Sequence, residues 1–438
     1  MIIEELERKF LDFKETGFPS YTNRECKIKE APLMVSTIIG ARRAGKSIRT
    51  FQLADETINS GKIPGKNHIC YLDFDNPILA RMQAHELKLI HLHFLKLNPG
   101  FTLKTPIIFI FDEIHKISGW EEYVIELSRN PLWKVYVTGS SSKMLHGEMS
   151  TALRGKSLST IIYPFNFREF VSHKGIKYLQ LSTINVAIIK RFFEEYLKWG
   201  SFPAIGNLSD SIKESVLREY FDTMILRDII ERYNISKPQQ CIYLLRYILS
   251  NIARPYTLNS GYLALKNAKF STSEDSIRNY IDWAADSFLC FSVPFFSDSI
   301  SKQTRNHLKI YCIDWALANV NNWVWDGMLT RSLENLIFIH LKQLGYQVNY
   351  YLTKEKRQEI DFIVTDTKGT IVKLIQVCYS IQNEDTCKRE TEPLVKTMKY
   401  FNIKKSYIIT LNDENTWDYD SGQIVVLPAW KWLLFEDF

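Results

Sequence analysis

Cysteine is scarce in this chain, and the cysteines that are present are not paired in sequence. Seven occur in 438 residues, an odd number, and no two are spaced as CxxC. This pattern argues against both a disulfide framework and a zinc site. We therefore expect a protein of the reducing cytoplasm.

Long hydrophobic runs and a targeting segment are lacking as well. No stretch of about 18 apolar residues occurs, and the opening MIIEELERKF is acidic and amphipathic instead of basic and then apolar. Neither a membrane span nor a signal peptide is expected. Internal repeats, low-complexity tracts and long linkers are also missing.

A large excess of charge of one sign is absent too. The formal net charge is +6, so a polyanionic partner is compatible with the charge but is not required by it. Apolar residues make up 45% of the chain. A chain of this length and composition can form about two to four domains, each with its own buried core.

The pattern of apolar residues changes twice along the chain. Residues 31–165 alternate four apolar runs (MVSTIIG, HICYLDF, PIIFIFDEI, WKVYVTGS) with amphipathic stretches, which predicts a parallel α/β sheet. Residues 186–300 repeat apolar side chains three and four apart, as helices do. After residue 320 a long helix precedes the strands QVNYYLT, EIDFIVT, IVKLIQVCYS and SYIITL. The expected domains are therefore 1–175, 176–310 and 320–438.

The stretch GARRAGKS matches the phosphate-binding loop GxxxxGK[ST] in full, with an apolar strand before it and a helix after it. Gly40 and Gly45 allow the tight turn that aims backbone N–H groups at phosphate oxygens. Lys46 would neutralise the β- and γ-phosphates, and the Ser47 hydroxyl would ligate Mg²⁺. The expected ATP-binding residues are Gly40, Ala41, Arg42, Arg43, Ala44, Gly45, Lys46 and Ser47.

A second motif supports the first. The apolar run PIIFIFDEI ends in Asp112 and Glu113. Asp112 is expected to hold the magnesium ion directly or through water, and Glu113 to orient and activate the attacking water. The plainer alternative is a buried strand that ends in a solvated acidic turn.

Two further residues are candidates for the same site. Ser140, in VYVTGSSS, could contact the γ-phosphate or the attacking water, or it could cap the following helix. Arg154, in STALRGKS, could act as an arginine finger that completes the site of a neighbouring subunit in a homo-oligomer, or it could be an exposed loop residue.

Four stretches, GARRAGKS, FDEIHKISGWEEYVIEL, TGSSSKML and LRGKSLSTIIYPFNFREF, carry a resemblance over nearly the whole chain. They closely resemble the bacterial and archaeal AAA-type ATPases that continue into a winged-helix region and a C-terminal domain of uncharacterised function. The resemblance implies an ASCE-class P-loop fold with Asp112 and Glu113 as Walker B. It also implies a serine-rich sensor strand at 140–142, a turn at Arg154 and Gly155, and ATP as the nucleotide.

The middle of the chain is expected to contain a winged helix. Residues 271–273 cap a helix with an apolar stripe, and FLCFSVPFF follows as a strand pair. The exposed face would carry Ser276, Arg278 and Asn279 as tentative DNA contacts. Residues 237–309 hold nine Lys and Arg and five Asp and Glu, a net +4, which supports duplex DNA modestly. Protein docking or bracing between subunits is the alternative.

The C-terminal segment follows the residue order of restriction-endonuclease-like folds. Glu334 lies on a helix, Asp361 opens a strand, and Gln376 and Cys378 stand on the next strand where [DE]xK belongs. A thiol cannot replace the lysine, so we expect an α/β nuclease fold with a vestigial metal site at Glu334, Asp361 and Gln376. Lys373 could substitute from another position. The run KEKRQ could bind phosphates or form a solvated hairpin turn.

Three functions are compatible with these patterns. The first is a P-loop ATPase that uses ATP and Mg²⁺ to move a DNA-associated C-terminal half. The second is a nucleotide-gated scaffold for protein partners that does not bind DNA. The third is an ATP-regulated nuclease, which the altered [DE]xK pattern makes the weakest of the three. A steep loss of DNA affinity with salt would separate the first from the second.

Overall fold

The computed structural model describes all residues except the following: 1, 141–152, 154, 179–181, 298, 300, 302, 304–306, 322–327, 356 and 436–438. The chain forms two compact units. The first runs to Tyr163 and includes Asp286–Phe288, and the second consists of Pro164–Ala285 and Leu289–Phe438. Three domains were expected from the sequence; in the structure the helical middle and the C-terminal α/β segment share one unit.

The first unit is built on a five-stranded sheet in the order β2-β3-β4-β1-β5, and every neighbouring pair is parallel. Its strands are β1 (Val35–Ile39), β2 (Ile69–Asp73), β3 (Ile107–Asp112), β4 (Trp133–Gly139) and β5 (Ser157–Ile161). The parallel α/β sheet expected from the apolar runs is confirmed. The edge strand β5 was not predicted, because its sequence SLSTI is short, polar and only half buried.

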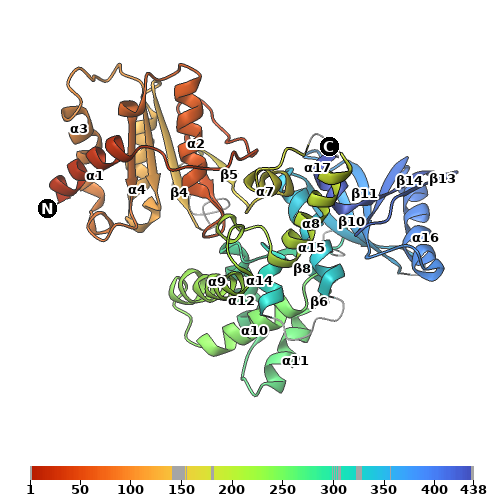
Figure 1. Cartoon of the computed structure of the whole chain (residues 1–438). Coiled ribbons are helices and arrows are strands. Elements are labelled where there is room, and N and C mark those ends of the chain that lie inside the picture. The colour runs from red at the N-terminus through yellow and green to blue at the C-terminus, as the bar shows by residue number, and fades with distance from the viewer. Residues whose placement is uncertain are drawn as a thin grey trace. The chain divides into compact units, whose positions relative to one another are not determined.

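Helices surround this sheet, as the red-to-yellow part of Figure 1 shows. They are α1 (Ile2–Thr16), α2 (Lys46–Asn59), α3 (Lys88–Lys96) and α4 (Trp120–Ser128), with short 3-10 turns at Lys66–His68, Leu79–Arg81, Ala84–Glu86 and Ile114–Lys116. Because strands of a parallel sheet are covered on both faces, they read as continuous apolar runs. All six residues of β3 are buried, which accounts for the unbroken IIFIF before the acidic pair.

The second unit begins with helices. These are α7 (Phe167–His173), α8 (Thr183–Trp199), a 3-10 turn (Pro203–Ile205), α9 (Asp210–Thr223), a π-helix (Met224–Glu231), α10 (Pro238–Ser250), α11 (Leu258–Asn267) and α12 (Glu274–Asp286). The helical periodicity predicted for this region is confirmed. On α12 the expected apolar stripe is buried: Ile277, Tyr280, Ile281 and Ala284.

A small antiparallel sheet in the order β6-β8-β7 accompanies these helices. Its strands are β6 (Pro255–Tyr256), β7 (Cys290–Val293) and β8 (Leu308–Cys312). The prediction of a strand pair within FLCFSVPFF is wrong. This stretch supplies only β7, which ends before Pro294, and its partner is the later strand β8. Proline has no N–H to donate to a ladder, which explains the end of β7 at that point.

The C-terminal part of the second unit contains a six-stranded mixed sheet in the order β13-β14-β12-β11-β10-β9. The elements are α14 (Trp315–Val320), α15 (Met328–Gln343), β9 (Gln347–Leu352), β10 (Glu359–Thr365), β11 (Ile371–Val377), α16 (Glu384–Phe401), β12 (Lys405–Thr410), β13 (Asn415–Tyr419), β14 (Gly422–Pro428) and α17 (Ala429–Phe435). The strands β9, β10 and β11 form an antiparallel meander, and β11 continues in parallel to β12. The predicted α15 and β9 to β12 are all present.

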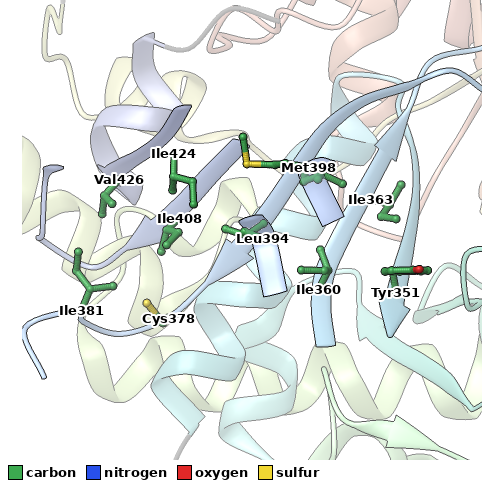
Figure 2. Close-up of a cluster of buried hydrophobic side chains, with 11 residues drawn as sticks. Tyr351, Ile360, Ile363, Cys378, Ile381, Leu394, Met398, Ile408, Ile424 and Val426 are labelled. Atoms are coloured by element: carbon green, nitrogen blue, oxygen red, sulfur yellow. The ribbon is translucent and has the colours of Figure 1, made fainter. Parts of the chain in front are cut away.

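Packing of α16 on this sheet creates a cluster of buried apolar side chains, which Figure 2 shows. Leu394 and Met398 of α16 meet Ile360, Ile408 and Ile424 of the strands. Cys378, which follows β11, belongs to the same cluster and is 3% exposed. The position where a nuclease lysine was sought therefore faces an apolar core.

Among the described residues, no helix combines the length and the hydrophobicity that a bilayer crossing requires.

Candidate functional site

The loop after β1 is closely packed around Gly40. This glycine has φ +148°, and a Cβ built on it would lie 2.2 Å from the backbone oxygen of Ile162. Two more residues of the loop have positive φ: Arg43 at 66° and Gly45 at 96°. Gly45 is the N-cap of α2, so the N-terminal end of that helix opens onto the loop. The backbone thus makes the tight turn that the glycines in GARRAGKS predicted, and phosphate binding by this loop stays a prediction.

Replacing Gly40 with alanine is expected to destabilise the first unit and weaken nucleotide binding. Alanine at positive φ costs about 1–2 kcal/mol, and contact with Ile162 adds an overpacking cost, for a total of about 3 kcal/mol. Gly61→Ala is the matched control, because Gly61 also has positive φ (+72°) but has no atom within 4 Å of the place that a Cβ would take. Denaturant unfolding measures both; equal losses would contradict the steric argument.

Lys46 opens α2 and is 6% exposed. Its ammonium donates to the carbonyl oxygens of Gly40 and Ala41, each at 3.2 Å, and lies 3.8 Å from Oε1 of Glu113. The buried ammonium of Lys46 is therefore held by two loop carbonyls and one carboxylate. It lies beside the loop that the sequence predicts to bind phosphate.

The acidic pair lies at the carboxyl end of β3. Asp112 is 5% exposed, and the Thr138 hydroxyl donates to its Oδ1. Burial raises the pKa of Asp112, and hydrogen bonds from the hydroxyls of Ser47 and Thr138 partly offset that rise. Glu113 has left-handed backbone (φ 53°), which costs a non-glycine residue about 1 kcal/mol or more. Its carboxylate lies 3.3 Å from Nδ1 of His115.

Two residues at this edge were missed by sequence reasoning. Thr138 of β4 joins the acidic pair, because its hydroxyl donates to Asp112 and accepts the backbone N–H of Glu113 at 3.1 Å. Asp73 ends β2 in register with Asp112. Burial raises the pKa of Asp73, and the neighbouring Asp112 raises it further. The strand order places these residues together, and the run VYVTGSSS was the available signal for Thr138.

A third missed residue supports the loop from outside. Arg24 is 7% exposed and lies in the segment between α1 and β1. Its guanidinium donates to the carbonyl oxygens of Ala44, at 2.9 Å, and Tyr163, at 2.6 Å. Gln52 of α2 accepts its backbone N–H at 2.9 Å. Arg24 therefore ties the phosphate-binding loop to the end of the segment that follows β5.

Of the remaining predicted residues of the first unit, some lie near the acidic pair and others lie outside the described residues. Ser140 directly follows β4 and is 1% exposed, at the same edge of the sheet as Asp112. Gly155 has φ +71°. Arg154 and residues 141 and 142 lie outside the described residues. The roles proposed for Ser140 and Arg154 stay predictions.

On α12 the tentative DNA contacts face outward, apart from one. Arg278 and Asn279 are exposed, whereas Ser276 is half buried. The hydroxyl of Ser273 caps the helix by accepting the backbone N–H of Ser276 at 3.2 Å, and the two hydroxyls lie 3.0 Å apart. Ser276 is thus engaged in the start of its own helix.

The three residues of the predicted vestigial metal site are brought together from α15, β10 and β11. Asp361 and Glu334 both lie beside the ammonium of Lys309, and the backbone N–H of Asp361 donates to Oε1 of Gln376 at 2.7 Å. Lys309, from β8, was not predicted to take part. Lys373 instead lies 5.1 Å from the ring centroid of Tyr407. The KEKRQ run connects the antiparallel strands β9 and β10.

Comparison with protein families divides the chain into three matched segments. Residues 34–171 match an AAA domain, residues 190–323 match a domain of unknown function (DUF8612), and residues 329–432 match another domain of unknown function (DUF4143). The Walker-type ATPase of Pyrococcus abyssi is a similar solved structure, with 15% identity and a TM-score of 0.44 over 73% of this chain and 95% of that chain.

Two relatives extend along almost the whole chain. An uncharacterized protein of Haemophilus influenzae is 25% identical over 97% of this chain and 96% of its own length. An uncharacterized protein of Methanocaldococcus jannaschii is 33% identical over 430 residues, which cover 94% of this chain and 91% of the relative. The chain therefore belongs to the same family as this archaeal protein, with an AAA-type P-loop ATPase domain followed by the two domains of unknown function.

Proposed function

We propose that the first unit binds ATP with Mg²⁺ and hydrolyses it. One observation carries the proposal: Lys46, Asp112 and Glu113 meet at the carboxyl edge of the sheet, beside a loop whose Gly40 leaves no room for a Cβ. Ligands of open α/β sheets bind at the carboxyl ends of the strands. ATP in preference to GTP follows from the family resemblance.

Each residue has a distinct role in this proposal. The loop N–H groups and Lys46 bind the β- and γ-phosphates, and Arg24 holds the loop in shape through Ala44. Glu113 orients water and accepts its proton. Thr138 fixes the acidic pair through the two hydrogen bonds of its hydroxyl. The left-handed backbone of Glu113 supports a functional role, because strained residues cluster at active sites.

The residues fit a magnesium ion. The Ser47 hydroxyl and the Asp112 carboxylate already lie within hydrogen-bond reach of each other, and both are hard oxygen donors. They would hold the ion when the nucleotide is bound. Mg²⁺ would there neutralise charge on the phosphate oxygens.

We further propose that the second unit contains a winged helix that contacts duplex DNA. The element order α10, β6, α11, α12, β7, β8 supports this proposal, because three helices precede a hairpin that pairs with a short first strand. Arg278 and Asn279 on the exposed face of α12 would approach the DNA. Nucleotide state would then alter how the DNA is held.

A second candidate, a nucleotide-gated protein scaffold without DNA binding, is favoured by the charges of the same segment. One of its nine basic residues, Lys309, is 1% exposed and paired with carboxylates. Another, Arg246, lies 3.6 Å from Asp222. The positive surface available to DNA is therefore smaller than the sequence count indicates.

Steady-state ATPase activity with and without duplex DNA separates the two candidates. We expect duplex DNA to stimulate turnover, and the stimulation to fall steeply as salt rises, because phosphate contacts release counterions. Arg278→Ala should reduce the stimulation, while Lys62→Ala, an exposed lysine of the first unit, should not. Glu113→Gln serves as the blank for contaminating ATPase.

Slow turnover that DNA leaves unchanged at low salt would contradict the DNA-coupled function and favour the scaffold. The absence of any turnover above the blank would contradict ATP hydrolysis itself.

A further inference from the structure

A buried lysine lies among the carboxylates of the C-terminal sheet. Lys309 of β8 is 1% exposed. Its ammonium lies 2.8 Å from Oε1 of Glu334 and 3.2 Å from Oδ1 of Asp361, and it also pairs with Glu359. One ammonium thus contacts carboxylates from α15 and from two positions on β10. Three carboxylates therefore share one buried cation.

Oxygens of Glu334 and Asp361 in this cluster also accept hydrogen bonds from other groups. The Tyr311 hydroxyl donates to Oε1 of Glu334 at 2.7 Å, the same oxygen that Lys309 contacts. The backbone N–H of Val377 donates to Oδ2 of Asp361 at 2.9 Å. Gln376 accepts from Asp361 and donates to Glu390 at 2.7 Å. The magnesium ion implied by a nuclease-like fold does not fit beside Lys309, and the described residues contain no metal-binding group of three His, Cys, Asp or Glu side chains.

The charges explain why the lysine stays ionised in this setting. Burial acts to lower the pKa of Lys309, but the charges of Glu334 and its neighbours outweigh burial and raise it well above its usual value. Burial acts to raise the pKa of Glu334, and the ammonium of Lys309 opposes this rise. A buried charge without a partner costs several kcal/mol, so the carboxylates require a cation.

We infer that Lys309 is the resident cation of this site and occupies the place of a divalent metal, so that the C-terminal sheet does not cut DNA by a metal-dependent mechanism. The inference is independent of ATP hydrolysis in the first unit. Lys309 here neutralises buried carboxylates, whereas the lysine of a [DE]xK motif would position an attacking hydroxide. An ammonium held by Glu334, Glu359 and Asp361 fills the metal position and leaves no space for a metal beside it.

The test is to remove the ammonium and measure metal binding. In the full chain without nucleotide, Lys309→Met should lower the melting temperature on the order of 10 °C, because it leaves buried carboxylates unpaired. Mn²⁺ at mildly alkaline pH should recover at least half of that loss and should bind with one added site per chain, counted by electron paramagnetic resonance. Lys373→Met is the matched control and should gain no Mn²⁺ site. Lys309→Gln, which keeps a hydrogen-bond donor, is the second variant if Lys309→Met does not fold.

Each other result overturns the inference. If both Lys309 variants fold and neither gains a Mn²⁺ site, the ammonium does not stand in a metal position. If the wild type binds Mn²⁺ and Asp361→Asn removes that binding, a metal coexists with Lys309. Mn²⁺-dependent DNA cleavage by the wild type that Asp361→Asn abolishes would likewise overturn it. The wild-type measurements do not depend on the folding of any variant.

Discussion

Lys46→Ala is expected to abolish ATP binding at concentrations that saturate the wild type, with a loss of affinity of about 100-fold. The ammonium would make charge-assisted hydrogen bonds to phosphate worth about 1.5–3 kcal/mol, and every 1.4 kcal/mol is about tenfold in affinity. In the structure this ammonium contacts two loop carbonyls and lies near Glu113. Calorimetry with ATP and Mg²⁺ measures the change.

The control for this variant is Lys62→Ala, which removes an exposed lysine of the same unit just after α2. It should bind ATP like the wild type. Circular dichroism should be used to check that Lys46→Ala folds, because the substitution removes the donor to the buried carbonyls of Gly40 and Ala41. If the two variants bind ATP equally well, the nucleotide does not occupy this loop.

Glu113→Gln should retain ATP binding and lower turnover by about 10²–10⁴-fold, the usual contribution of a general base. Glutamine has nearly the same shape as glutamate, so the left-handed backbone and the hydrogen bond from the Glu113 N–H to Thr138 can persist. Only the proton-accepting carboxylate is lost. Single-turnover hydrolysis and equilibrium binding, measured on the same preparation, separate the two effects.

Glu126→Gln is the matched substitution away from the loop, on the exposed side of α4. It should hydrolyse ATP at the wild-type rate. Wild-type turnover by Glu113→Gln would remove Glu113 as the base and direct attention to Asp73, the other carboxylate in register with Asp112.

The sequence was most informative where the candidate site residues are neighbours along the chain. Residues 40–47 form one loop, and Asp112 and Glu113 end one apolar strand, so a local motif contains all that is needed to predict them. Thr138 and Asp73 reach the site only because β4 and β2 both neighbour β3. No local sequence pattern indicates the order of strands in a sheet. Nor does a local pattern indicate that Arg24, in the irregular segment between α1 and β1, contacts the loop.

The C-terminal cluster shows the same limit more strongly. Glu334, Asp361 and Gln376 could be aligned with a known order of residues, and the structure brings them together. Lys309 is 25 residues from Glu334 and 52 from Asp361. In the sequence it is a single lysine in the apolar run LKIYC, and only the pairing of β8 with β7 and β6 and the packing against α15 explain its burial.

The Lys309 cluster also determines how the chain can be divided. The boundary expected between residues 310 and 320 separates Lys309 from all three of its carboxylates. A fragment that ends there carries a lysine that has lost its counter-ions, and a fragment that begins there carries acids that have lost their cation. Because either half would leave charges that only the other half can neutralise, we expect the two matched domains of unknown function to fold together and neither to be stable alone.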